Sequence, residues 1–213
     1  TQRTAAPTAH PTVVSTAVPT PASMWSTLYF LGASKSYVVP VYRQSSPYTV
    51  RIARRTVDLM VEGPRSGTNL LRTIPSGMTV NDVTVSGSTL RVDFGQRFED
   101  LGAGQAEAMG VVWALTEFSN IAQVQFLHNG SPVGLPGSGN TDPVSRPAYM
   151  NFEDPYAVGP GGGTNLMLFF ATPDGRYLIP IVRRVPATTE VAATAINEMI
   201  QGPSAAHPGL VRL

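Results

Sequence analysis

Apolar and polar residues alternate along the first half of the chain in short runs that predict a series of strands. Two apolar runs, residues 28–31 and 37–42, enclose a polar turn, which is the pattern of a β-hairpin. Residues 79–85 and 89–94 alternate in a similar way around a Ser-Gly-Ser turn. We therefore expect two hairpins, and a last strand over residues 124–127 before an Asn-Gly turn.

Apolar residues recur at helical spacing in two further segments of the same region. The first segment opens at Thr49 and ends at Gly63-Pro64, where glycine permits a left-handed cap and proline cannot continue the helix. The second covers residues 103–118, with Trp113 on its apolar face. The order of elements is ββαββαβ, with hairpins in place of crossovers. It predicts an α+β domain in which two helices lie on one face of an antiparallel or mixed sheet.

The second half of the chain repeats part of the first. Leu28-Tyr29-Phe30 matches Leu168-Phe169-Phe170 at a shift of 140 residues, and the V-V-P-V and L-I-P-I runs that follow keep this shift. The first helix and its Gly-Pro stop return within residues 186–203. The second copy contains no counterpart of residues 74–127. We therefore expect a partial second copy, and a chain that continues beyond Leu213.

These features divide the chain into four segments. We expect a stalk over residues 1–23, a first domain over 24–131, a connector over 132–164 and the partial second copy over 165–213. The stalk is rich in Thr, Ala and Pro and has neither helical nor strand period. Such a stretch is typical of an exported protein that has lost its signal peptide, often beside a lipid anchor, and the alternative is an interdomain linker. Three apolar residues of the stalk are expected to contact another chain or the first domain: Val13, Val14 and Val18.

Composition narrows the class of function. The 213 residues include no cysteine, which excludes disulfides and thiolate metal sites. Fifteen Lys and Arg against 14 Asp and Glu leave a net charge of +1, which is too small for general binding to nucleic acid. No apolar run approaches the ~18 residues that a membrane-spanning helix needs. The sequence therefore predicts neither a nucleic-acid-binding protein nor an integral membrane protein.

Motifs for catalysis are also missing from the sequence. It contains no G-x-S-x-G, no H-E-x-x-H and no G-x-G-x-x-G that follows a strand. His10, His128 and His207 have no metal-ligand spacing, and we expect them at the surface. We therefore expect no enzymatic activity, no cofactor and no metal.

Three arginines form a candidate interaction site on the first predicted helix. Arg51, Arg54 and Arg55 lie at positions i, i+3 and i+4 and make one basic stripe. This pattern is typical of a solvated face, here with an ion pair between Arg54 and Asp58. The functional alternative is a docking patch for an acidic partner.

Two carboxylates form a weaker alternative site. Asp93 and Glu117 both stand near the ends of predicted elements, where a pair of carboxylates can share a cleft and perform acid–base chemistry. A structural role explains them as well, because an Asp at a strand end caps amides and a Glu at a helix end pairs with arginine or solvent.

Several fragments, taken in order, resemble the GerMN domain. They are Leu28-Tyr29-Phe30, Val38-Val39-Pro40-Val41, Gly63-Pro64, Ile74-Pro75-Ser76-Gly77, Val92-Asp93-Phe94, Leu115-Thr116-Glu117-Phe118 and Val124-Gln125-Phe126-Leu127. The resemblance covers residues 24–131 and implies an exported, often lipid-anchored protein without enzymatic activity. Relatives in sporulating bacteria serve envelope-spanning assemblies, and the domain is similar in shape to the ring-building modules of secretion machines.

Residues and resemblance together predict a non-enzymatic scaffold or accessory subunit of a membrane-associated assembly. The expected partners are other exported or membrane proteins, with no nucleic acid and no small-molecule substrate. The expected location is extracytoplasmic, at a membrane, through a lipid anchor upstream of this chain. The alternative is a cell-wall or small-ligand binding protein, or a hydrolase, that uses a carboxylate cleft.

Overall fold

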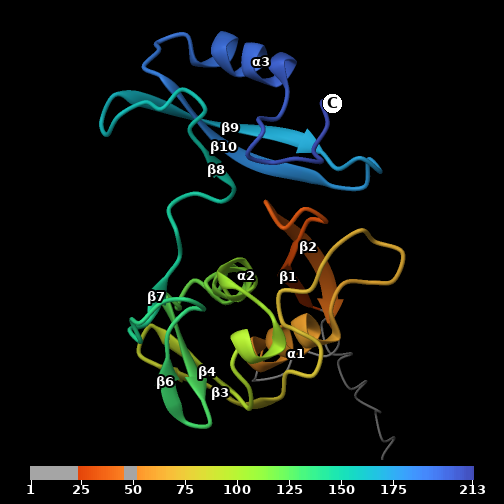
Figure 1. Ribbon diagram of the computed structural model, residues 1–213, viewed down its shortest axis with the longest axis vertical. Coiled ribbons are helices and arrows are strands. Elements are labelled where there is room, and N and C mark those ends of the chain that lie inside the picture. Colours follow the sequence, from red (N-terminus) through yellow and green to blue (C-terminus); the bar gives the residue numbers. More distant parts are fainter. Residues whose placement is uncertain (1–23, 46–51) are drawn as a thin grey trace, which may run out of the picture.

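The structure is a computed structural model that describes residues 24–45 and 52–213. Two units follow one another along the long axis of the molecule (Figure 1). The first unit contains β1 (Met24–Leu31), β2 (Val38–Ser45), α1 (Ile52–Glu62), β3 (Val80–Ser86), β4 (Thr89–Phe94), a short 3-10 helix (Glu99–Leu101), α2 (Gln105–Leu115), β5 (Gln123–His128), β6 (Ser131–Val133) and β7 (Val144–Ser145). The second unit contains β8 (Phe152–Glu153), β9 (Gly163–Ala171), β10 (Leu178–Pro186) and α3 (Val191–Gln201).

The strands of the first unit confirm the α+β class and the order ββαββαβ. Strands β1 and β2 form an antiparallel hairpin of their own. A second, mixed sheet has the order β3-β4-β5-β6, in which β4 and β5 are parallel. Strand β7 pairs with the first two residues of β5, Gln123 and Val124. The strands are thus divided between two sheets, and α1 and α2 contact strands of both.

Helix α2 is central to the hydrophobic core of the first unit. Its sequence is apolar on nearly every side, as expected for a helix enclosed by other elements. Trp113 is buried and its ring lies 6.1 Å from the ring of Tyr29 on β1. Helix α2 also contacts α1 and β5. This position joins the hairpin, the other helix and the larger sheet in one core.

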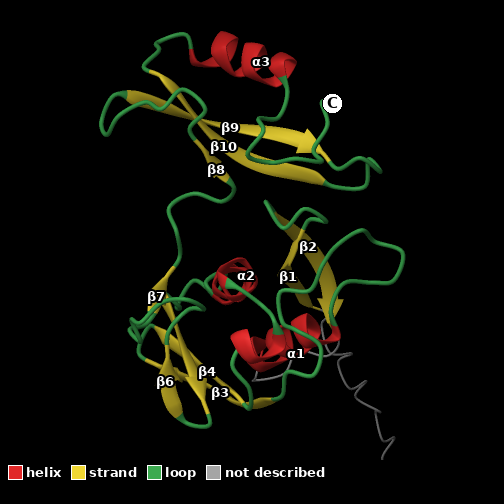
Figure 2. Ribbon diagram, viewed as in Figure 1, coloured by secondary structure: helices red, strands yellow, loops and turns green. Residues whose placement is uncertain are grey.

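The tandem repeat predicted from the sequence is confirmed in three dimensions. Elements β1, β2 and α1 return as β9, β10 and α3, and each hairpin is extended by one bridge, Leu31 with Leu71 and Ala171 with Val211. Figure 2 shows α3 on one side of the β9–β10 hairpin and the first unit on the other side. The two copies therefore share the same local arrangement: a hairpin, a helix, and then a returning segment, around Leu71 or Val211, that pairs with the hairpin.

Residues between the two copies add short strands to both units. Strand β7 joins the first unit, whereas β8 pairs in parallel with β10 and belongs to the second unit. No helix in the described part of the chain has the length and apolarity of a membrane span.

Candidate functional site

The predicted basic stripe is only partly described. Arg51 lies outside the described residues, as do Val13, Val14 and Val18. On α1, the Nε of Arg54 donates to Asp58 at 2.9 Å, and Nη1 of Arg55 donates to Glu62 at 3.0 Å. Both arginines therefore have acidic partners on their own helix, and a docking role for the stripe stays a prediction.

Asp93 and Glu117 are held by separate sets of partners. Asp93 accepts hydrogen bonds from the backbone N–H of Gly130 at 3.0 Å and from the amide of Asn81 at 3.3 Å. Asp93 thereby fixes the turn between β5 and β6, where Gly130 has a φ of 81°. Glu117 instead lies beyond the end of α2 and contacts β1 and a distant loop. The structure does not bring the two carboxylates to one set of partners.

Glu117 belongs to a cluster that ties β1, α2 and the loop after β7 together. The Tyr29 hydroxyl donates to Glu117 at 2.7 Å, and Arg146 donates to the same carboxylate. The Arg146 guanidinium lies 4.3 Å from the centre of the Trp113 ring, a cation–π contact. Burial, reinforced by the Glu117 carboxylate, raises the pKa of the Tyr29 phenol. Arg146 was not a candidate from the sequence, since it lies in the connector.

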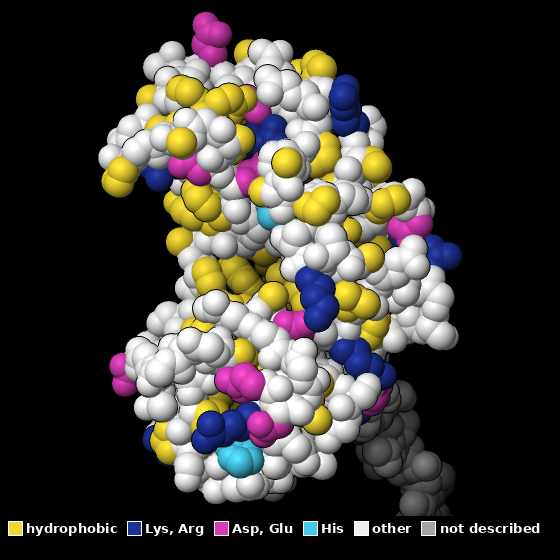
Figure 3. All heavy atoms as spheres, viewed as in Figure 1, with side chains coloured by type: hydrophobic (Ala, Val, Ile, Leu, Met, Phe, Trp, Pro, Cys, Tyr) yellow, Lys and Arg dark blue, Asp and Glu magenta, His cyan; other side chains and the backbone are white. Residues whose placement is uncertain are grey.

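The side of the β9–β10 hairpin that lies opposite α3 and is turned toward the first unit carries an apolar surface, which we call the outer face. It consists of Met167, Phe169, Leu178, Pro180 and Val182. Met167, Phe169 and Leu178 are exposed. The outer face borders a hollow of about 620 Å³, whose opposite wall includes Tyr42, Trp113 and Tyr149 of the preceding segments. Figure 3 shows hydrophobic side chains gathered in the hollow between the two units.

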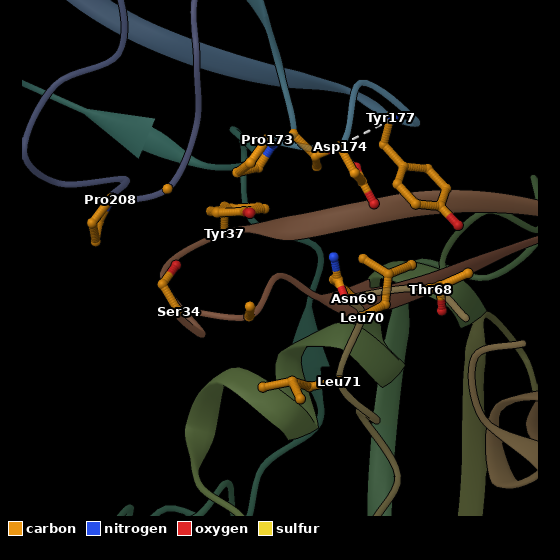
Figure 4. A pocket seen from close by; sticks show the side chains of 13 residues that line it. Ser34, Tyr37, Thr68, Asn69, Leu70, Leu71, Pro173, Asp174, Tyr177 and Pro208 are labelled. Atoms are coloured by element: carbon orange, nitrogen blue, oxygen red, sulfur yellow. Dashed lines mark hydrogen bonds between the residues drawn. The ribbon is translucent and has the colours of Figure 1, made fainter. Parts of the chain in front are cut away.

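A second hollow, the inter-repeat cavity, lies where corresponding loops of the two copies meet. Its volume is about 680 Å³. The hairpin turn and the returning segment of each copy line it, with contributions related by the repeat, such as Tyr37 and Tyr177 or Ser34 and Asp174. Figure 4 shows Asp174 and Tyr177 reaching from the second unit toward Asn69, Leu70 and Thr68 of the first. The remaining lining residues are Ala33, Leu71, Thr172, Pro173, Pro208 and Gly209.

Two side chains fasten the second unit to the first beside this cavity. The Asn151 amide accepts from Val38 N–H at 2.7 Å and donates to the carbonyls of Val38 and Pro180, each at 2.9 Å. The expectation that His207 lies at the surface is wrong, because its ring is buried between the units. Its Nδ1 lies 2.9 Å from the Ser36 carbonyl oxygen, and its Nε2 lies 3.2 Å from the Asn151 carbonyl oxygen.

Comparisons with known proteins agree with this architecture. Residues 27–134, half of the chain, match the family model Germane, described as sporulation and spore germination. Over 142 residues the chain is 29% identical to the spore germination protein GerM of Bacillus subtilis (strain 168), which covers 62% of this chain and 38% of GerM. The chain thus spans less than half the length of that relative.

A solved structure shows the same fold. The tandem GerMN domains of the sporulation protein GerM from Bacillus subtilis match with a TM-score of 0.63 and 24% identity, over 90% of this chain and 71% of that one. Because the match covers 90% of this chain, it includes both copies of the repeat. The resemblance to the GerMN domain is confirmed, and the chain belongs to the Germane family of sporulation and spore germination proteins.

Proposed function

We propose that this protein is a non-enzymatic scaffold or accessory subunit of a membrane-associated, extracytoplasmic assembly, and that its partners are other exported or membrane proteins. Similarity to a sporulation and germination protein supports an envelope role of this kind. The observation that carries the proposal is the outer face of β9–β10, which is apolar and carries the exposed side chains of Met167, Phe169 and Leu178.

Comparison of the two copies shows how unusual this exposure is. Tyr29 of β1 is 3% exposed because α2 covers it, whereas its counterpart Phe169 is 41% exposed. Similarly, Val57 of α1 is fully buried and its counterpart Ile196 on α3 is 60% exposed. Within the described residues, the second copy therefore presents to solvent two surfaces that the first copy buries. Burial of a large apolar side chain stabilises a contact by roughly 1.5–3 kcal/mol, so these surfaces favour association.

The first unit indicates which kind of partner element fits. At Gly110 helix α2 lies close to Thr73 and to the backbone of β1, because an added Cβ would lie 2.3 Å from the Thr73 side chain and 3.5 Å from the Tyr29 carbonyl oxygen. Its Trp113 then lies beside the Tyr29 ring. By the same geometry, we infer that an apolar helix with a small residue at the contact and an aromatic side chain nearby would cover Phe169.

The enzymatic alternative has less support. A hydrolase built on Asp93 and Glu117 needs both carboxylates in one cleft, yet each accepts hydrogen bonds from different elements. The exposed apolar strip is the feature expected of a scaffold, so the assembly role is the function we propose.

The test places a charge on the outer face. We expect Phe169→Glu to retain the melting temperature of the native chain, because the site is exposed, and to abolish its migration with a larger complex in native gels of solubilised membranes. Val85→Glu, at another exposed apolar position on β3, is the matched control and should leave the complex intact. Equal behaviour of the two variants would contradict the proposal.

A further inference from the structure

The inter-repeat cavity has the size and the walls of a ligand site. Its volume of about 680 Å³ lies within the range of roughly 300–1,000 Å³ that is usual for ligand pockets. Apolar surface comes from Tyr37, Leu70, Leu71, Pro173 and Pro208. We propose that this cavity binds a neutral carbohydrate, with one or two sugar rings held between the two copies of the repeat. This role goes beyond the assembly function, which depends on the outer face.

The two copies differ at one position beside the cavity, which is glycine in the first copy and threonine in the second. This difference gives Tyr37 and Tyr177, the two tyrosines of the cavity, different positions. The Tyr37 ring lies over Gly32, where an added Cβ would be 2.2 Å from the ring. Thr172 occupies the corresponding place in the second copy, and its hydroxyl accepts from the Tyr177 N–H at 3.2 Å. Tyr177 therefore has no room for the same position and reaches across the cavity toward Thr68 (Figure 4). Tyr37 forms a buried wall, and Tyr177 offers an accessible aromatic face to a ligand.

The polar groups of the cavity suit hydroxyl groups. Oδ1 of Asp174 accepts from the Thr172 hydroxyl at 2.6 Å and from the Arg176 N–H at 3.3 Å. These contacts, led by the Thr172 hydrogen bond, lower the pKa of Asp174, so a charged acceptor is present at neutral pH. Asn69 and Ser34 each contribute both a donor and an acceptor. Sugar hydroxyls also donate and accept, while the C–H face of a sugar ring packs on an aromatic face.

Other ligand classes match the cavity less well. A phosphate group would meet the Asp174 carboxylate, and the cavity lining contains no lysine or arginine. Arg176 lies close by, where its Nε is 3.9 Å from Oδ2 of Asp174 and its guanidinium donates to the Gly67 carbonyl of the first unit. An isolated ammonium group would pair with Asp174 and leave the neutral donors and the broad apolar walls unused. The combination of aromatic surface, mixed hydrogen-bonding groups and one carboxylate therefore favours a neutral sugar.

The test is a titration of sugars into the full chain. Binding is measured by isothermal titration calorimetry and by changes in backbone NMR chemical shifts. The probes are chitotriose and maltotriose, at concentrations up to about 10 mM, which detects even millimolar dissociation constants. We expect saturable binding of at least one probe, with shifts confined to the residues of the inter-repeat cavity. Inorganic phosphate and a lysine-containing tripeptide serve as the competing ligand classes. Saturation by either of these alone, or by no probe, would overturn the proposal.

Substitutions connect binding to the cavity. We expect Tyr177→Ala and Asp174→Asn to weaken sugar binding at least tenfold, and Tyr177→Phe to weaken it less than Tyr177→Ala because the aromatic face remains. Tyr42→Ala, at an exposed tyrosine outside this cavity, is the matched control and should bind as the native chain does. Melting curves confirm folding of each variant. Equal loss in Tyr42→Ala, or undiminished binding in Asp174→Asn and Tyr177→Ala together, would contradict a site between the repeats, whatever the outcome for the outer face.

Discussion

One arginine in each copy fixes the end of a helix against a hairpin. Arg43 donates to the carbonyls of Leu59 and Gly63 at 3.3 and 2.9 Å. Arg183 donates to the corresponding carbonyls, of Glu198 and Gly202, at 3.3 and 2.8 Å. Carbonyls at the end of a helix have no partner within it, so each guanidinium satisfies groups that would otherwise be buried without hydrogen bonds.

The two arginines differ in their charged surroundings. Burial lowers the pKa of Arg43, whose nearest carboxylate is the exposed Glu62 at 3.7 Å. Burial acts in the same direction on Arg183, but hydrogen bonds to Glu198 and Glu153 outweigh it and raise its pKa. Arg183 is therefore the cation of a buried ionic cluster, whereas Arg43 mainly serves carbonyl groups.

This difference predicts unequal effects of substitution. Arg183→Met leaves two buried carboxylates without their cation, and we expect it to lower the free energy of unfolding by about 3–5 kcal/mol. Arg43→Met should cost less, about 1.5–3 kcal/mol, because it removes charged hydrogen bonds without stranding a buried charge. Urea unfolding of both variants measures the difference. Adding Glu153→Gln to Arg183→Met should recover part of the loss, and a double variant no more stable than the single one would contradict the cluster.

The raised pKa of the Tyr29 phenol makes the stability of the protein depend on pH. Burial and the Glu117 carboxylate hold its pKa above the value of about 10 for an unfolded chain. The folded state therefore binds the phenolic proton more tightly. The resulting stabilisation is complete below about pH 10 and is lost as the pH rises toward the folded pKa. We expect the free energy of unfolding, measured with urea, to decline between about pH 8 and pH 11, and to decline less steeply in Tyr29→Phe. The same slope in both proteins would argue against this interaction.

At the scale of elements, local sequence predicts most strands and helices of the first unit. The apolar residues of β4 that the pattern assigns to one face, Leu90 and Val92, are both buried. Helix α1 ends at Glu62, directly before Gly63, whose φ of 82° needs glycine or a strained residue. These features follow from the sequence because period, turn and cap are all contained within a few neighbouring residues.

Sheet membership could not be predicted in the same way. The β1–β2 hairpin carries a strand pattern like that of β3 and β4, yet it forms a separate sheet. What separates the hairpin from the larger sheet is the packing of α1 and α2 against strands of both. That arrangement depends on contacts such as Trp113 with Tyr29, between residues far apart in the chain.

Helix α2 gives a direct test of this packing. Because Trp113 is buried between β1 and Arg146, we expect Trp113→Ala to lower the free energy of unfolding by about 3–5 kcal/mol. Trp25→Ala is the matched control, since Trp25 is 62% exposed, and should change stability by less than about 0.5 kcal/mol. Thermal or urea unfolding measures both. Near-native stability of Trp113→Ala, combined with lost association, would instead place Trp113 in a partner interface.

At the scale of the whole molecule, the second unit is attached through residues whose role the sequence did not reveal. His207 and Asn151 make their contacts only after the two copies are brought together. The hydrogen-bonding partners of Asn151 include Val38, which is 113 positions away in the chain. The inter-repeat cavity was missed for the same reason, because loops from both copies build its walls. An internal repeat predicts that two similar units exist, but not how they meet.

In the proposed assembly, a partner protein covers the outer face of β9–β10. This contact is tested most directly by a photo-crosslinking amino acid at position 169, in the full-length protein in its native membrane, with position 85 as the control. We expect an adduct at position 169 that mass spectrometry resolves as this protein joined to another exported protein, and no such adduct at position 85. An adduct that joins position 169 only to another part of the same chain, or equal adducts at both positions, would contradict the claim.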